Sequence, residues 1–174
     1  IVGVSMGAVV GATYALNDDW FDALVAMDTS GFPATPGFRL PGLAARMRGL
    51  RTALLAARDM YFGWGVGTPT ETWGRSVLSS LTQGKNLKNG RIPIFVCATD
   101  MLTGKRVVFG KGNATDYIYA SAALAGILPP LVDGPHVLMD GAYADIAPVD
   151  VARETGAKVV IAVDPSQSEN TIGP

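Results

Sequence analysis

The stretch that decides the fold is Ile1-Val2-Gly3-Val4-Ser5-Met6-Gly7, which is followed by an Ala- and Val-rich run that ends near Leu16. The apolar start predicts the end of a buried strand and the later run predicts a helix, so strand, turn and helix follow without a spacer. The centre matches Gly-x-Ser-x-Gly, a strained turn that exposes a serine oxygen. A chance match occurs in about one in ten chains this rich in glycine. The strand and helix around it favour a nucleophilic Ser5.

The composition limits the class of protein. The chain has 174 residues, of which 48% are hydrophobic and 17% are charged, and this suits one α/β domain with its own core. No apolar run reaches the roughly 18 residues of a membrane span. The formal net charge of -1 gives no basic field for nucleic acid, so nucleic-acid binding is not expected.

Cysteine content bears on cofactors and redox chemistry. Cys97 is the single cysteine and lies in an apolar run, so no internal disulfide can form and a metal cluster has too few ligands. We therefore expect neither a metal nor a cofactor, and we interpret Cys97 as a small core residue. A cytoplasmic or peripheral-membrane protein is favoured, although a targeting segment ahead of Ile1 would not be visible.

Strand and helix patterns alternate along the rest of the chain, which predicts a three-layer α/β/α sandwich with a mostly parallel central sheet. The expected strands are residues 91–100, 105–109, 137–139 and 158–163, with 105–109 antiparallel to the first of these across the Thr103-Gly104 turn. The expected helices are residues 43–60, 115–124 and the segment from Pro148 to Gly156. The polar tail from 166 to 174 is interpreted as a frayed end or a linker.

An elbow serine needs a base, and two arrangements are open. The only histidine, His136, precedes the best-placed acid, Asp140, whereas α/β-hydrolases place the acid before the histidine. Asp100, Asp116 or Asp133 could serve as the acid in that order. A serine–aspartate pair fits better, because Asp140 ends an apolar strand and Gly141 lets the backbone approach another loop closely. We interpret Asp100, Ser121 and His136 as structural residues.

Together these motifs resemble those of the patatin-like phospholipases, which combine a Gly-x-Ser-x-Gly elbow with an Asp-Gly-Gly or Asp-Gly-Ala motif and use no histidine. Here the second motif is Asp140-Gly141-Ala142, in the family's order. Further segments that look like the family's are 98–104, 120–130 and Pro148-Val149. The resemblance therefore covers nearly the whole chain.

The resemblance implies a lipid acyl hydrolase of the phospholipase A or esterase type, in which Ser5 carries the acyl group and Asp140 is the general base. It also implies an oxyanion donor in the backbone N–H of Met6, and an elbow and dyad loop shaped by Gly3, Gly7 and Gly141. The implied partner is a phospholipid or another acyl-ester lipid, with peripheral membrane contact. Two alternatives remain: a noncatalytic acyl-lipid-binding module of this fold, and an acyltransferase that uses the same dyad.

One family feature is not seen in the sequence. Patatin-like proteins carry a glycine-rich loop ahead of the elbow that supplies oxyanion donors. We therefore expect residues 1–174 to be a single catalytic domain that lacks the first strand, this loop and the first helix. The cluster at 63–67 does not follow a strand and is interpreted as an ordinary loop. The arginine-rich helix at 43–60 could meet anionic lipid, but an ordinary amphipathic helix is preferred.

Overall fold

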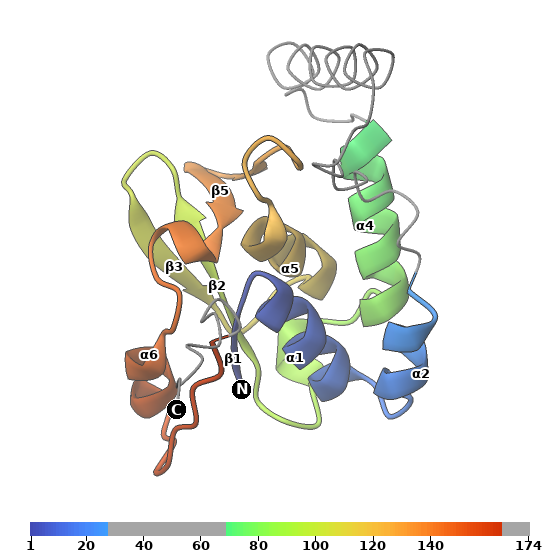
Figure 1. Cartoon of the computed structure of the whole chain (residues 1–174), viewed down its shortest axis with the longest axis vertical. Helices are drawn as coiled ribbons and strands as arrows, with labels where there is room; N and C mark the ends of the chain where they lie inside the picture. Colours follow the sequence, from blue (N-terminus) through green and yellow to red (C-terminus); the bar gives the residue numbers. More distant parts are fainter. Residues whose placement is uncertain (28–68, 165–174) are drawn as a thin grey trace, which may run out of the picture.

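The structure, a computed structural model, describes residues 1–27 and 69–164. It contains one sheet with helices packed against it (Figure 1). The strands are β1 (Val2–Val4), β2 (Phe95–Asp100), β3 (Lys105–Phe109), β4 (Leu131–Asp133) and β5 (His136–Asp140). The helices are α1 (Met6–Leu16), α2 (Trp20–Val25), α4 (Pro69–Thr82), α5 (Ala114–Ala122), α6 (Val149–Glu154) and the short η1 (Leu87–Asn89) and η2 (Gly141–Tyr143). The features predicted at 43–60, 63–67 and 166–174 lie outside the described residues.

The strands follow the order β1-β2-β5-β4, and β3 also pairs with β2. Only β1 and β2 are parallel, whereas β2 is antiparallel to both β3 and β5, and β4 to β5. The predicted α/β fold is confirmed, but the described sheet is mixed rather than mostly parallel. Short turns explain two of these antiparallel pairs, because a tight turn joins β2 to β3 at Thr103-Gly104 and β4 to β5 at Gly134, which has a φ of 56°. The antiparallel pair of β2 and β5 is made across a longer connection that contains β3, α5 and β4.

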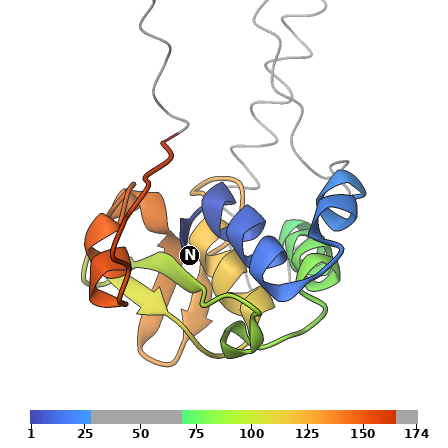
Figure 2. The same ribbon diagram turned by 90° about the horizontal axis from the view of Figure 1, so that it is seen from below.

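The sheet is covered on both faces, as the two views in Figures 1 and 2 show: α1 and α5 lie on one side and α6 on the other. Alternation along β2 explains how one strand serves both layers. Val96 and Ala98 belong to the core on the α1 and α5 side. Cys97 points the other way and is fully buried, which confirms its interpretation as a core residue. Burial raises the pKa of the Cys97 thiol to about 11.

The first helix after the elbow is held at its far end as well as at its start. Its buried side chains are small or apolar, so α1 packs closely against the sheet. At the C-terminus, the Asn17 side chain donates to the Leu81 carbonyl at 2.5 Å, and Lys85 Nζ donates to the Leu16 carbonyl at 2.7 Å. The Leu16 and Leu81 carbonyls lie in the last turns of α1 and α4, where a carbonyl has no hydrogen-bond partner within its own helix. Therefore α1 is fixed relative to α4.

One predicted strand is wrong. Residues 158–163 follow α6 as irregular chain, and Val159, Ile161 and Val163 are 80–86% exposed. Within the described part of the chain, β1 pairs only with β2, and no strand pairs with 158–163. A run of β-branched residues forms a strand only when a neighbour takes up its backbone hydrogen bonds. The elements predicted from the sequence include neither α4 nor the three-residue strand β4.

Candidate active site

The turn between β1 and α1 has the strained geometry expected of a nucleophile elbow. Ser5 has φ 54° and ψ −128°, a conformation that a residue with a side chain rarely adopts. Gly3 is required beside it, because a Cβ there would lie 2.5 Å from the Cα of Ala8. At Gly7, by contrast, an added Cβ meets nothing within 4 Å among the described atoms. The close approach of strand and helix therefore depends on Gly3.

The structure brings Ser5 and Asp140 together across 135 residues of sequence. Ser5 Oγ donates to Asp140 Oδ2 at 2.5 Å. The other carboxylate oxygen, Oδ1, accepts from the backbone N–H of Ala142 at 2.9 Å. Asp140 is 2% exposed. One oxygen thus fixes the carboxylate to its own loop, while the other faces the serine hydroxyl.

Neighbouring groups hold the loop after Asp140 in place. Thr99 Oγ1 donates to the Asp140 carbonyl at 2.8 Å and accepts from the backbone N–H of Ala144 at 3.1 Å. Gly141 packs directly on β2, because a Cβ there would lie 2.3 Å from the carbonyl oxygen of Cys97. The sequence pattern pointed to Gly141 for close approach, but it gave no role to Thr99.

An ion-pair cluster lies on the α6 side of the same loop. Arg106 on β3 contacts the Asp145 carboxylate and makes two bonds to Asp150, at 2.9 Å and 2.5 Å. The Asp145 N–H in turn donates to the Gly141 carbonyl at 3.0 Å. The hydrogen bond from Arg106 lowers the pKa of Asp150. Arg106 therefore ties the dyad loop to α6.

His136 and the acids of the alternative triad do not lie beside the Ser5–Asp140 pair. His136 Nδ1 lies 3.2 Å from Asp100 Oδ2, so a histidine and an acid do meet. However, His136 begins β5 and Asp140 ends it, which separates them by about 13 Å along an extended strand. The two other candidate acids bind other partners, Asp116 to Arg75 and Asp133 to the Tyr117 hydroxyl.

Met6 is the first residue of α1 and follows Ser5 directly. The first N–H groups of a helix have no partner within it, and the helix dipole places partial positive charge there. The Met6 N–H therefore has the position and polarity to receive a developing oxyanion. Its side chain is half exposed.

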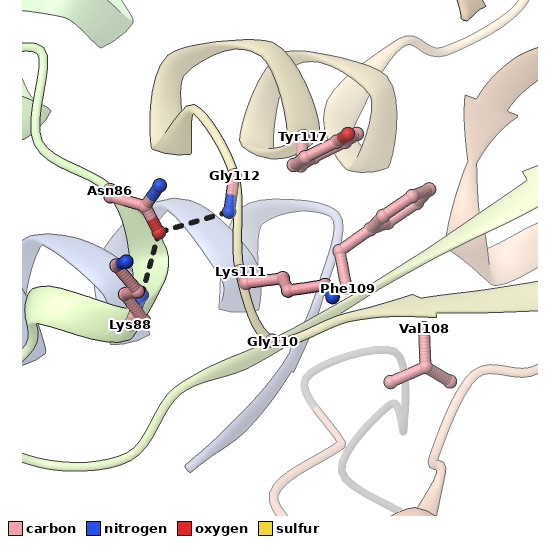
Figure 3. Close-up of a pocket in the computed structure, with 8 residues that line it drawn as sticks. All are labelled: Asn86, Lys88, Val108, Phe109, Gly110, Lys111, Gly112 and Tyr117. Atoms are coloured by element: carbon pink, nitrogen blue, oxygen red, sulfur yellow. Dashed lines mark hydrogen bonds between the residues drawn. The ribbon is translucent and has the colours of Figure 1, made fainter. Parts of the chain in front are cut away.

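A cavity of about 550 Å³ lies away from the dyad, at the N-terminal end of α5 (Figure 3). Its lining includes Asn86, whose side-chain oxygen accepts from the backbone N–H groups of Lys88 and Gly112, and the stacked rings of Phe109 and Tyr117. The C-terminal end of the same helix lies beside the dyad instead. None of the predicted site residues lines this cavity.

The described residues offer neither a metal site nor a membrane-spanning helix. Residues 1–27 and 69–164 contain no group of three or more side chains suited to hold a metal ion. In the same residues, every helix is too short or too polar to cross a membrane.

Known proteins are similar in sequence to this chain. Residues 1–153 match the family described as patatin-like phospholipase. The chain is 29% identical over 173 residues to patatin-like phospholipase domain-containing protein 7 of Mus musculus, covering 98% of the chain and 12% of that protein. It is 29% identical over 171 residues to lysophospholipase NTE1 of Cryptococcus neoformans, covering 98% of the chain and 10% of that protein.

A shorter stretch is more similar to a human relative. Over 91 residues the chain is 40% identical to patatin-like phospholipase domain-containing protein 6 of Homo sapiens, covering 51% of the chain and 7% of that protein. The chain thus spans about a tenth of the length of these curated relatives. Since the family match covers most of its residues, the chain belongs to the patatin-like phospholipase family.

Proposed function

We propose that this chain is the catalytic part of a lipid acyl hydrolase that acts through a Ser5 acyl-enzyme, with Asp140 as general base. The observation that carries the proposal is the 2.5 Å bond between Ser5 Oγ and Asp140 Oδ2 at a strained elbow. The family membership and the lysophospholipase name of one relative support a lipid substrate. The proposed substrate is an acyl ester of a phospholipid or a related lipid.

The proposed reaction has two half-reactions. Ser5 Oγ attacks the ester carbonyl carbon while Asp140 takes the hydroxyl proton, and the Met6 N–H stabilises the oxyanion. The oxyanion then collapses, and Asp140 gives the proton to the departing alcohol. Asp140 next takes a proton from water as the water oxygen attacks the acyl-enzyme. The fatty acid leaves, and the proton returns to Ser5.

A carboxylate in water is a weak base at neutral pH, so this pair depends on its surroundings. Asp140 is nearly excluded from solvent, and its Oδ2 already accepts the Ser5 proton in a hydrogen bond. The rate of the reaction then depends strongly on stabilisation of the oxyanion, because the loss of one hydrogen-bond donor typically lowers the rate by roughly 10²–10³-fold. We propose that residues 1–174 form one catalytic domain and that donors besides Met6 come from a glycine-rich loop ahead of Ile1.

The test is labelling and turnover in the intact protein. A serine-directed fluorophosphonate should label Ser5, and Ser5→Ala should abolish labelling and lower hydrolysis of a short acyl ester by more than roughly 10³-fold. The matched control is Ser80→Ala, which removes an exposed serine hydroxyl that bonds only locally, to the Val77 carbonyl. Ser80→Ala should keep both fluorophosphonate labelling and ester hydrolysis.

The outcome also separates the alternatives. Unimpaired turnover in Ser5→Ala would remove the enzyme assignment. Lipid binding without turnover or labelling in the wild type would favour a noncatalytic lipid-binding module. Product analysis with an added acceptor alcohol distinguishes hydrolysis from acyl transfer, because a transferase would form a new ester in place of the free fatty acid.

A further inference from the structure

Ser121 lies at the end of α5 and is bonded to the backbone of the nucleophile. The Ser5 N–H donates to Ser121 Oγ at 2.9 Å, and Ser121 Oγ donates to the Cys97 carbonyl at 2.6 Å. Its side chain is fully buried, so water does not replace either partner. One hydroxyl thus joins the elbow, α5 and β2.

The position of this hydroxyl follows from the sheet. The parallel ladder between β1 and β2 includes the bond from the Phe95 N–H to the Ile1 carbonyl, at 2.9 Å. Continued regularly, it would place the Ser5 N–H against the Cys97 carbonyl. Ser5 instead turns into a strained conformation with positive φ. The Ser121 hydroxyl bonds to both groups, and so completes the ladder at the point where the chain leaves it.

The same end of α5 also holds the other member of the dyad. The Asp140 N–H donates to the Ala123 carbonyl at 3.1 Å. Gly141 packs against the Cys97 carbonyl that accepts from Ser121. The Ser121 hydroxyl accepts from the Ser5 N–H and the Ala123 carbonyl accepts from the Asp140 N–H, and these two bonds fix where Ser5 and Asp140 lie relative to each other.

We propose that Ser121 is a positioning residue of this active site, whose hydroxyl holds the strained Ser5 backbone so that Oγ stays aligned with Asp140. The inference rests on the proposed function. A strained conformation persists only where its surroundings enforce it. Without the hydroxyl, the Ser5 N–H and the Cys97 carbonyl lose their shared partner, and the elbow relaxes.

The test measures kcat, KM and fluorophosphonate labelling in the intact protein. Ser121→Ala should lower kcat and the labelling rate about 10- to 100-fold, the usual cost of a misplaced reacting group. KM should change less than about twofold, because Ser121 does not touch substrate. The matched control is Tyr119→Phe on the same helix, which deletes a buried hydroxyl that donates to the Pro129 carbonyl at 2.9 Å. It should lower the Tm to a similar extent and leave kcat unchanged.

A second variant covers the case in which Ser121→Ala fails to fold. Ser121→Cys keeps the shape of the side chain but supplies a weak donor and a weak acceptor, so it should fold and still lose kcat. The proposal is wrong if Ser121→Ala keeps kcat within about twofold of wild type. It is also wrong if Tyr119→Phe loses as much kcat as Ser121→Ala, or if both Ser121 variants unfold where Tyr119→Phe folds.

Failure of the proposed function looks different. In that case the wild-type protein neither hydrolyses esters nor is labelled, or Ser5→Ala remains active, and the inference about Ser121 falls with it. If instead the wild type is labelled and active and Ser5→Ala is neither, the Ser121 variants decide the inference alone.

Discussion

Two aspartates end strands of the same sheet and are almost equally buried, with Asp140 2% and Asp100 3% exposed. Asp100 uses its carboxylate entirely on local structure: it accepts from the N–H groups of Leu102 and Val137 and from the Thr103 hydroxyl, and it contacts His136. Asp140 uses one oxygen in this way, at Ala142. Its second oxygen faces Ser5.

The comparison teaches that burial and strand position do not distinguish the carboxylate proposed as general base from a structural one. Both aspartates are followed closely by a turn with a glycine, and both have several donors. The difference lies in the hydroxyl that donates to each carboxylate. Asp140 accepts from Ser5, which is held in a strained elbow, whereas Asp100 accepts from Thr103 in the following turn. The Asp100–His136 pair combines two of the three residue types of a catalytic triad, but within residues 1–27 and 69–164 no serine is bonded to it.

The largest expected effect comes from neutralising one aspartate and not the other. Asp140→Asn should lower kcat by about 10²–10⁴, the usual contribution of a general base, because the amide nearly keeps the shape and loses the basicity. Asp100→Asn should keep kcat and lower the Tm, since it disturbs four local contacts. Steady-state kinetics and thermal unfolding of both variants measure the contrast.

His136→Ala sharpens the same test, because it removes the only histidine. We expect kcat to stay within about twofold of wild type, as befits a residue outside the reacting groups. If His136→Ala lost activity as completely as Ser5→Ala, a triad would have to replace the dyad, with Asp100 as its acid.

The glycines of the two aspartate turns give the next largest contrast. A Cβ at Gly141 would overlap the backbone carbonyl of Cys97 at 2.3 Å, so Gly141→Ala must move the dyad loop. It should cost about 1–3 kcal/mol of stability and about 10²-fold in kcat. At Gly104, with φ +68°, a Cβ meets nothing within 4 Å among the described atoms. Gly104→Ala should cost about 1–2 kcal/mol from strain alone and leave kcat unchanged.

Chemical denaturation and steady-state kinetics of both glycine variants decide this prediction. Equal loss of activity in Gly104→Ala and Gly141→Ala would mean that the two turns are equally coupled to the reaction. The contrast between the aspartates would then fail.

The parts of this site that could be predicted from the sequence are those encoded by short-range patterns. The elbow around Ser5 and the Asp140-Gly141 turn each follow from a few adjacent residues, because glycine spacing records close backbone approach. The contacts that support these two turns cannot be predicted from adjacent residues. Thr99 reaches Asp140 across 41 residues, and Ser121 reaches Ser5 across 116. No local period encodes such a partner, so the sequence alone predicts only a structural role for Ser121.

Strand prediction failed for a related reason. Residues 158–163 have the apolar, β-branched composition of a strand, but a strand is a property of two segments, and composition describes one. The helix α4 was missed although Pro69 at its first position and Leu78 and Leu81 in its last turns are helix signals.

The smallest expected effect concerns the acid stability of the ion pair between Arg106 and Asp150, which lies at α6. Arg106 holds down the pKa of the Asp150 carboxyl, so the pair stabilises the fold above the ordinary aspartate pKa of about 4. This stabilisation is lost as the pH falls through the lowered pKa in the folded protein. The Tm difference between wild type and Arg106→Met should therefore be constant from about pH 7 to 5 and shrink below about pH 4.

Asp150→Asn is the matched control for this titration, because it removes the carboxylate and keeps Arg106 in contact with Asp145. Its Tm difference from wild type should shrink over the same acid range. The nearby Cys97 thiol stays neutral throughout, since burial raises its pKa to about 11. The pair is exposed at Asp150, so the effect should weaken in high salt. A Tm difference for Arg106→Met that persists undiminished at pH 3 would show that Arg106 supports α6 by packing of its side-chain stem rather than by charge.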